Sequence, residues 1–133
     1  MKKFCYVLLL LCAMAVTACT PKARLEIEVA AANGSCPMDL EEGFTITKIE
    51  TEGNNIVYEC VCDEDDYVIS DFEDPEVKSV MKSVVLMSFQ NNQDERTREL
   101  IRLCKDANYN IVYRYVGRIT ASTCDIKIFS DEL

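Results

Sequence analysis

Two cysteines separated by one residue, Cys60-Val61-Cys62, are the clearest candidates for covalent chemistry in this sequence. A dithiol of this kind can exchange disulfides, and cysteine is the one evident nucleophile in a chain that contains no histidine. A reactive thiol needs a lowered pKa, which a helix N-terminus or nearby cations usually supply. Here Glu59 and the acids after Cys62 oppose thiolate formation. We therefore favour a structural role, and thiol–disulfide exchange at Cys60 and Cys62 is the alternative hypothesis.

The four acids that follow, at positions 63–66, carry the hard oxygen ligands that calcium prefers. A calcium loop usually interleaves its ligands with a turn glycine, and this run contains none. A solvated loop is the favoured interpretation, and calcium-dependent adhesion through Asp63, Glu64, Asp65 and Asp66 is a third hypothesis. Zinc is disfavoured because histidine is absent and the cysteine spacing matches no finger or ribbon. We expect no catalytic residues, no metal site and no cofactor.

The first residues have the layout of an export signal. Lys2 and Lys3 supply a positive start, and an apolar stretch of eleven residues extends from Tyr6 to Val16. A membrane-spanning helix needs roughly 20 apolar residues, so this stretch is too short to remain in a bilayer as a span. The segment ends at Thr17-Ala18-Cys19.

Val16-Thr17-Ala18-Cys19 resembles the lipobox of bacterial lipoproteins. The resemblance implies cleavage between Ala18 and Cys19, a diacylglycerol on the Cys19 sulfur, and a fatty acyl chain such as palmitate on the new amino terminus. More than one acyl chain makes membrane anchoring stable. The alternative is an ordinary secretory signal cut after Ala18, with Cys19 free or disulfide-bonded. We expect a signal peptide over residues 1–18, a lipidated tether over 19–24 and a single domain over 25–133.

Charge limits the partners of this domain. Without residues 1–18 the chain keeps 12 cations against 23 acids, a net charge of −11. Nucleic acids and anionic lipid head groups repel such a chain, so we expect no nucleic-acid partner, and its hold on the membrane must come from the lipid on Cys19. The absence of histidine also excludes hydrolases that rely on a nucleophile–histidine dyad.

Five cysteines remain in the domain, and an exported protein meets an oxidising compartment. If Cys60 and Cys62 lie in one strand, their Cα atoms are about 6.6 Å apart and their side chains point the same way, so a bridge within the pair would break the strand. We predict a Cys104–Cys124 disulfide between a helix and a strand. Cys36 is then expected to bond Cys60 or Cys62, which leaves one thiol unpaired.

The N-terminal half of the domain predicts one helix and one hairpin. Residues 25–32 alternate like a strand, but the run of alanines and the preceding Pro21 favour a helix. Residues 44–51 and 55–62 are rich in strand formers, and Glu52-Gly53-Asn54 supplies the turn between them. Residues 67–70 could extend the second strand beyond the acidic loop.

The C-terminal half predicts two helices and a second hairpin. Asp74-Pro75 is a strong helix start, and a stripe at helical spacing is expected to face a core. Asn91 and Asn92 end this helix, a second begins near Asp94, and strands follow over 111–116 and 123–129 around Gly117. The stripe consists of Val77, Val80, Met81, Val84 and Val85; the second helix presents Leu100, Leu103, Cys104 and Ala107 on one side.

These elements follow the order α-β-β-α-α-β-β. They predict an α+β domain in which two hairpins form a four-stranded antiparallel sheet with helices packed on one face. Tyr113 and Tyr115 are expected on one face of the sheet, and Val112 and Val116 on the other.

Beyond the signal, the chain resembles small lipoproteins of Bacteroidota-type bacteria that have no assigned activity. The resemblance is carried by Asn33-Gly34-Ser35-Cys36-Pro37, Ile56-Val57-Tyr58, Leu103-Cys104, Ile111-Val112-Tyr113-Arg114-Tyr115 and Cys124. It implies a fold and an envelope location, and it conveys no activity. By similarity to lipoprotein sorting, Thr20 and the lack of acids directly after Cys19 imply the outer membrane and a domain that faces the periplasm.

The sequence thus predicts a membrane-anchored envelope lipoprotein that is not an enzyme. It would act as a binding or accessory module, through the exposed sheet face or its loops, on an envelope protein or a small ligand that the sequence does not identify.

Overall fold

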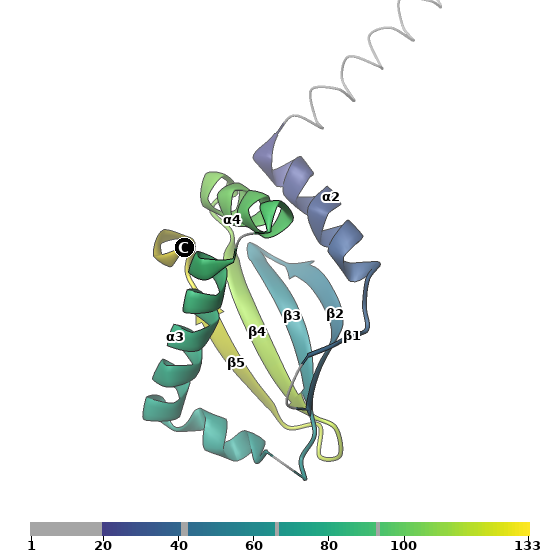
Figure 1. The fold of residues 1–133 in the computed structure, drawn as a ribbon, viewed down its shortest axis with the longest axis vertical. Coiled ribbons are helices and arrows are strands. Elements are labelled where there is room, and N and C mark those ends of the chain that lie inside the picture. The colour runs from purple at the N-terminus through teal and green to yellow at the C-terminus, as the bar shows by residue number, and fades with distance from the viewer. Residues whose placement is uncertain (1–19, 41–42, 66, 93) are drawn as a thin grey trace, which may run out of the picture.

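The computed structural model describes residues 20–40, 43–65, 67–92 and 94–133 of the chain, and Figure 1 shows their arrangement. Three α-helices and five β-strands make up the fold, with two short 3-10 helices. In chain order they are α2 (Pro21–Asn33), β1 (Met38–Asp39), β2 (Phe44–Glu52), β3 (Asn55–Cys62), η2 (Ile69–Glu73), α3 (Pro75–Asn91), α4 (Glu95–Ala107), β4 (Asn110–Gly117), β5 (Thr123–Ile128) and η3 (Ser130–Glu132).

The five strands form one sheet in the order β1-β2-β3-β4-β5. Both predicted hairpins are present, because β2 pairs with β3 and β4 pairs with β5 in antiparallel fashion. The prediction of a purely antiparallel, four-stranded sheet is wrong in two respects. β1 adds a short edge strand, and β3 and β4 are parallel, in register from Asn55 opposite Asn110 to Cys62 opposite Gly117.

The parallel pair follows from the connection between the hairpins. A parallel neighbour requires a crossover that returns the chain to the end of the sheet where the first strand began. α3 and α4 lie in the connection between β3 and β4 and supply that crossover, and they cover the sheet on the way (Figure 1). Sequence periodicity predicts where the strands are, but it does not predict whether the neighbouring strands of two distant hairpins are parallel or antiparallel.

One face of the sheet carries the core. The inward residues of the strands alternate with outward ones, as in Cys124, Ile126 and Ile128 of β5, which are all buried. They pack with residues of all three helices in a single cluster. The helical contribution comes from Leu25 and Val29 of α2, Phe89 of α3, and Leu103 and Cys104 of α4.

Capping chemistry explains where the helices begin and end, and it confirms the predicted starts of α3 and α4. The Asp74 carboxylate accepts from the backbone N–H groups of Glu76 and Val77, with Pro75 at the first helical position. Asp94 caps α4 in the same way through Thr97. Asn108 ends α4 with a φ of 58°, a left-handed conformation that asparagine tolerates.

Three local expectations differ from the structure. Residues 21–24, assigned to the tether, form the first turn of α2, because Thr20 accepts from the Ala23 N–H and caps a helix that begins at Pro21. Residues 67–70 do not extend β3; η2 occupies residues 69–73. Most of the predicted core stripe of α3 is exposed to solvent, namely Val77, Val80 and Val84, while Met81 and Val85 pack against the core.

Among the described residues, no helix covers the opposite face of the sheet (Figure 1), and ion pairs join its strands. The Arg114 guanidinium of β4 binds both carboxylate oxygens of Asp125, at 2.9 and 3.1 Å, and also reaches Glu52 at 3.2 Å. Because Glu52 lies in β2, Arg114 extends across β3. Val57 of β3 is buried although it lies on this open face.

No helix among the described residues is long and apolar enough to cross a membrane.

Candidate binding groove

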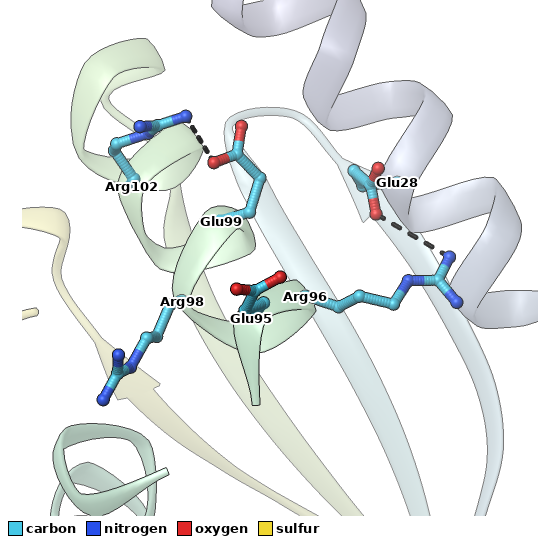
Figure 2. A pocket seen from close by; sticks show the side chains of 6 residues that line it. All are labelled: Glu28, Glu95, Arg96, Arg98, Glu99 and Arg102. Carbon is cyan, nitrogen blue, oxygen red and sulfur yellow. Dashed lines mark hydrogen bonds and ion pairs between the residues drawn. The ribbon is translucent and has the colours of Figure 1, made fainter. Parts of the chain in front are cut away.

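A charged depression of about 480 Å³ lies where α2 and α4 pack against each other. Figure 2 shows that its lining side chains come from both helices and that Arg98 points away from Glu28. All six lining residues are charged: Glu28, Glu95, Arg96, Arg98, Glu99 and Arg102. Acids and arginines are mixed along α4, so the surface offers paired charges rather than a field of one sign.

Ion pairs hold this rim in place. Glu99 accepts from Arg24 of α2 at 2.7 Å and also from Arg102, one turn further along α4. Arg96 of α4 lies 4.0 Å from Glu28 of α2. Each exposed pair contributes at most about 1 kcal/mol, so the contacts orient the side chains more than they stabilise the fold. Arg96 and Arg102 remain largely exposed and available to a ligand.

A second depression of about 280 Å³ continues from the first, with Glu28 and Arg96 common to both. Its floor is apolar and includes Ile49 of β2, Tyr58 of β3 and Leu100 of α4. We call the two depressions together the α2–α4 groove. It is lined further by Ala32, Ser35, Met38, Asp94 and Thr97.

Local hydrogen bonds hold one end of each wall of the groove. The Asn33 side chain, at the last position of α2, accepts from the Ile49 backbone N–H at 3.0 Å and fixes that end of α2 to β2. At the start of α4 the Asp94 backbone N–H donates to Asn92. The walls are therefore attached to the sheet and to the α3–α4 junction, and the groove is preformed.

The lining of the groove has the make-up of a binding site, with apolar residues and charged residues side by side. Its lining contains no cysteine, and the sequence contains no histidine. Burial raises the pKa of Tyr58, so its phenol stays protonated and cannot act as a base near neutral pH. An apolar floor with a few charged groups around it is the usual make-up of a recognition site.

The cysteines lie elsewhere, in the core. None of the five in the described residues is bonded to another, so the structure does not support the expected Cys104–Cys124 bridge or a Cys36 bridge. Cys60 and Cys62 do point to the same face of β3, as expected, and are 1 % and 0 % exposed. Cys104 and Cys124 are also buried, and Cys36 is half-buried.

Burial makes these thiols poor nucleophiles. It raises the pKa of Cys60 to about 12 and the pKa of Cys62 to about 11. The Cys62 thiol also donates a weak hydrogen bond to the Cys60 carbonyl oxygen at 3.8 Å. A buried thiol with a raised pKa is typical of a structural cysteine and unlike a redox centre.

One residue of the acidic run, Glu64, binds the turn between β4 and β5. The Glu64 carboxylate accepts from the backbone N–H and the hydroxyl of Thr120, at 3.1 and 2.6 Å. Asp63 accepts from the Asp65 backbone N–H, which is a local turn contact. No group of three or more potential ligands is arranged to hold a metal ion among the described residues; Asp66 lies outside them.

Ala18 and Cys19, the predicted cleavage and lipidation positions, also lie outside the described residues. The residues that form the groove did not stand out in the sequence. The sequence did contain one indication of the groove, a dense group of acids and arginines on the predicted second helix. The group consists of Glu95, Arg96, Arg98, Glu99 and Arg102. The matching side chains on α2, Arg24 and Glu28, become visible only when the two helices are brought together.

No protein-family model matches the sequence, and no curated protein matches it at a significant level. Solved structures share the fold. A Pseudomonas aeruginosa protein assigned as secreted superposes with a TM-score of 0.63 and 12 % identity, over 84 % of this chain and 91 % of its own.

Two pilotins of type II secretion systems superpose as well. AspS of Vibrio cholerae has a TM-score of 0.57 and 15 % identity, over 91 % of this chain and 99 % of its own. EpsS of Vibrio vulnificus has a TM-score of 0.55 and 9 % identity, over 84 % of this chain and 90 % of its own. At these identities the likeness establishes a common fold.

Proposed function

We propose that this chain is a lipid-anchored accessory protein of a bacterial envelope, and that it binds another envelope protein through the α2–α4 groove. The observation that carries the proposal is the preformed groove, with an apolar floor at Ile49 and Tyr58 and a rim of paired charges at Arg96 and Glu28. The fold common to this chain and two secretion-system pilotins supports an accessory role in the envelope.

The groove specifies the chemistry of the partner. Apolar side chains of an incoming segment would cover the floor, and acidic and basic side chains on either side would pair with Arg96, Arg102 and Glu28. Such contacts give specificity and register, while the apolar contact supplies most of the affinity. A protein segment that carries both signs of charge around an apolar centre therefore fits better than a nucleic acid.

The anchor is the second part of the proposal. α2 begins at Pro21, two residues after the predicted lipidation site at Cys19, so a lipid there would hold the α2 end of the domain against a bilayer. The outer membrane, with the domain in the periplasm, is the location that the residues after Cys19 favour. The redox alternative is not favoured, because Cys60 and Cys62 are buried and their pKa values are raised.

Photo-cross-linking in intact cells tests the groove. A photoreactive residue at Ser35 and another at Thr97, on opposite sides of the floor, should trap the same envelope protein. The additional substitution Arg96→Glu should abolish that adduct, because it reverses a charge on the rim. Arg118→Glu makes the same charge change in the distant β4–β5 turn and should leave the adduct intact. Adducts that differ between the two positions, or that survive Arg96→Glu, would refute binding in the groove.

Membrane fractionation tests the anchor separately. Cys19→Ser should release the chain from the membrane fraction, and mass spectrometry of the unsubstituted chain should find acyl groups on Cys19. Cys12→Ser lies within the predicted signal and is the matched control, which should remain membrane-bound. A chain that remains in the membrane after Cys19→Ser would contradict lipidation at this residue.

A further inference from the structure

The solvent side of α3 is unusually apolar. Four aliphatic side chains on it are exposed: Val77 at 37 %, Val80 at 63 %, Val84 at 61 % and Met87 at 57 %. A surface helix of a globular domain normally turns polar residues outward and keeps its apolar residues for the core. We call these four residues the α3 stripe. Their clustering on one helix face, rather than singly over the surface, is typical of an interaction site.

The spacing of the α3 stripe is that of a coiled-coil seam. Its members follow one another at intervals of three, four and three residues, which places them on one line along the helix. The inner side of α3 is separate and is occupied by Met81, Val85 and Phe89, which pack against the core. The sequence therefore contains two apolar faces on one helix, and the domain buries only one of them.

The flanks of the stripe allow a close neighbour. Ser83 and Ser88 lie beside it and are small, exposed and uncharged, and the exposed acid Glu76 lies beside its first turn. Lys78 and Lys82 are engaged with Glu73 at 2.9 Å and with Glu132 at 2.7 Å. In a strongly acidic protein, such a face brings few like charges together when two copies meet, because Glu76 in the first turn is the acid beside it.

We propose that the α3 stripe is the interface of a parallel homodimer, in which α3 of one copy packs along α3 of a second. In the heptad defined by the stripe, Val77, Val84 and Asn91 occupy equivalent positions. An asparagine at this position favours a parallel, in-register pair, because its amide can bond to the same residue of the partner.

The position of the N-terminal helix α2 also favours a parallel dimer. α3 runs along one side of the molecule toward the end where α2 begins (Figure 1), and Cys19 precedes α2 by two residues in the sequence. A parallel pair has its two-fold axis along the helices and leaves both chains leading to the same end, so both proposed lipids enter one bilayer. An antiparallel pair would send them to opposite ends. This orientation rests on the lipid anchor proposed above; the self-association itself does not.

The dimer is expected to be weak in solution. One helix face from each copy buries less than the roughly 1,200 Å² of total surface that characterises stable interfaces. Confinement of both copies to one membrane raises their effective concentration and favours the contact there. The α2–α4 groove lies on other elements and stays open in the dimer.

Single-cysteine cross-linking in native membranes tests the proposal. In a parallel pair, equivalent stripe positions face each other, so Val84→Cys should form a disulfide-linked dimer under a mild oxidant. Ile119→Cys, on an exposed turn away from α3, is the matched control and should remain monomeric. The unsubstituted chain measures any background from its own cysteines. A Val84→Cys chain that gives no dimer, or links to a different protein, would overturn the proposal.

Charge pairing in detergent solution gives an independent test of self-association. Val80→Glu should weaken the association of the full chain at least about tenfold, because two carboxylates would meet at the seam. Val80→Lys should do the same, whereas an equimolar mixture of the two variants should recover association as a heterodimer. Ile119→Glu should have no effect. Sedimentation equilibrium at millimolar protein that shows only monomer, or a mixture that fails to recover, would refute the parallel dimer.

Discussion

Burial decides the chemistry of the cysteine side chains in this protein. In sequence, Cys60 and Cys62 form a dithiol with an acidic run after it, and their reactivity depends on whether solvent reaches them. The structure puts both thiols in the core, where the loss of hydration raises their pKa values. The core holds Cys104 in the same state, with a pKa raised to about 12 by burial.

Native alkylation should therefore distinguish Cys36 from the other four cysteines of the domain. At pH 8 we expect modification of Cys36 alone, and slowly, because burial raises its pKa too. Denaturation should expose the remaining thiols to complete reaction. Peptide mapping by mass spectrometry, with and without guanidinium, measures both states. Rapid native labelling of Cys60 or Cys62 would contradict this prediction and favour the redox hypothesis.

The contact of Glu64 with the β4–β5 turn depends on a glycine. A Cβ atom at Gly117 would lie 1.6 Å from the Glu64 carboxylate oxygen, which is far inside van der Waals contact. We expect Gly117→Ala to displace Glu64 from Thr120 and to lower the free energy of unfolding by about 1–2 kcal/mol. In a Glu64→Ala background the same substitution should cost much less. Chemical denaturation of the four chains measures this coupling, and additive effects would show that the contact does not constrain Gly117.

At the scale of elements, the sequence predicted what local chemistry determines. Asp74-Pro75 and Asp94 specified two helix starts, and Glu52-Gly53-Asn54 specified a hairpin, because caps and turns act over a few residues. The parallel contact of β3 with β4 depends on the path of a long connection, and no pattern in either strand encodes it. No local pattern encodes the groove either, because its rim is formed by residues far apart in sequence, such as Arg24 of α2 and Glu99 of α4.

The predicted core face of α3 is a different kind of error. Helical spacing grouped Val77, Val80, Met81, Val84 and Val85 on one face that was expected to meet the core. Met81 and Val85 do pack against the core, whereas Val77, Val80 and Val84 are exposed. Periodicity tells which residues share a side of a helix. It does not tell whether that side packs against the same chain or another one.

The C-terminal 3-10 helix η3 is attached to α3 by one acid. Glu132 accepts from the Lys82 ammonium at 2.7 Å and from the Phe129 backbone N–H at 2.8 Å, and these bonds lower the pKa of Glu132 below its ordinary value of 4.5. Because the folded pKa is the lower one, this stabilisation is complete above pH 4.5 and is lost as pH falls through the folded pKa.

Glu132→Gln should accordingly lower the free energy of unfolding near pH 7 by about 0.5 kcal/mol, because the site is partly exposed, and should lower the melting temperature slightly. The difference from the unsubstituted chain should vanish as pH falls below the folded pKa. Asp131→Asn makes the same charge change one residue away and serves as the control in the same thermal melts. A difference that persists undiminished at pH 3 would contradict the ionic origin of the effect.

At the scale of the whole molecule, charge is unevenly distributed. Half of the 12 cations that follow residue 18 lie on α2 and α4, which leaves the rest of the domain strongly acidic. The end of the molecule next to Cys19 is thus close to neutral. This distribution suits a protein that is held by that end near anionic head groups and that keeps its acidic part away from them.

Self-repulsion among the acids should make stability depend on salt. We expect the melting temperature to rise between about 10 and 300 mM sodium chloride, as the Debye length shrinks from roughly 30 Å to under 10 Å. The rise should level off within this range, because screening saturates. A melting temperature that falls with salt would instead show that the surface ion pairs outweigh the repulsion.

The parallel junction between β3 and β4 has a consequence for how the chain folds. Each hairpin joins strands that are neighbours in sequence and can form early, whereas the central junction joins strands separated by residues 63–109. Closing so long a segment costs entropy before any contact compensates for it, and pairings of this kind slow folding. We therefore expect the late step to be the docking of two preformed halves through Ile56–Ile111 and its neighbours, and we expect the rate of that docking to limit how soon a newly made chain becomes a closed domain.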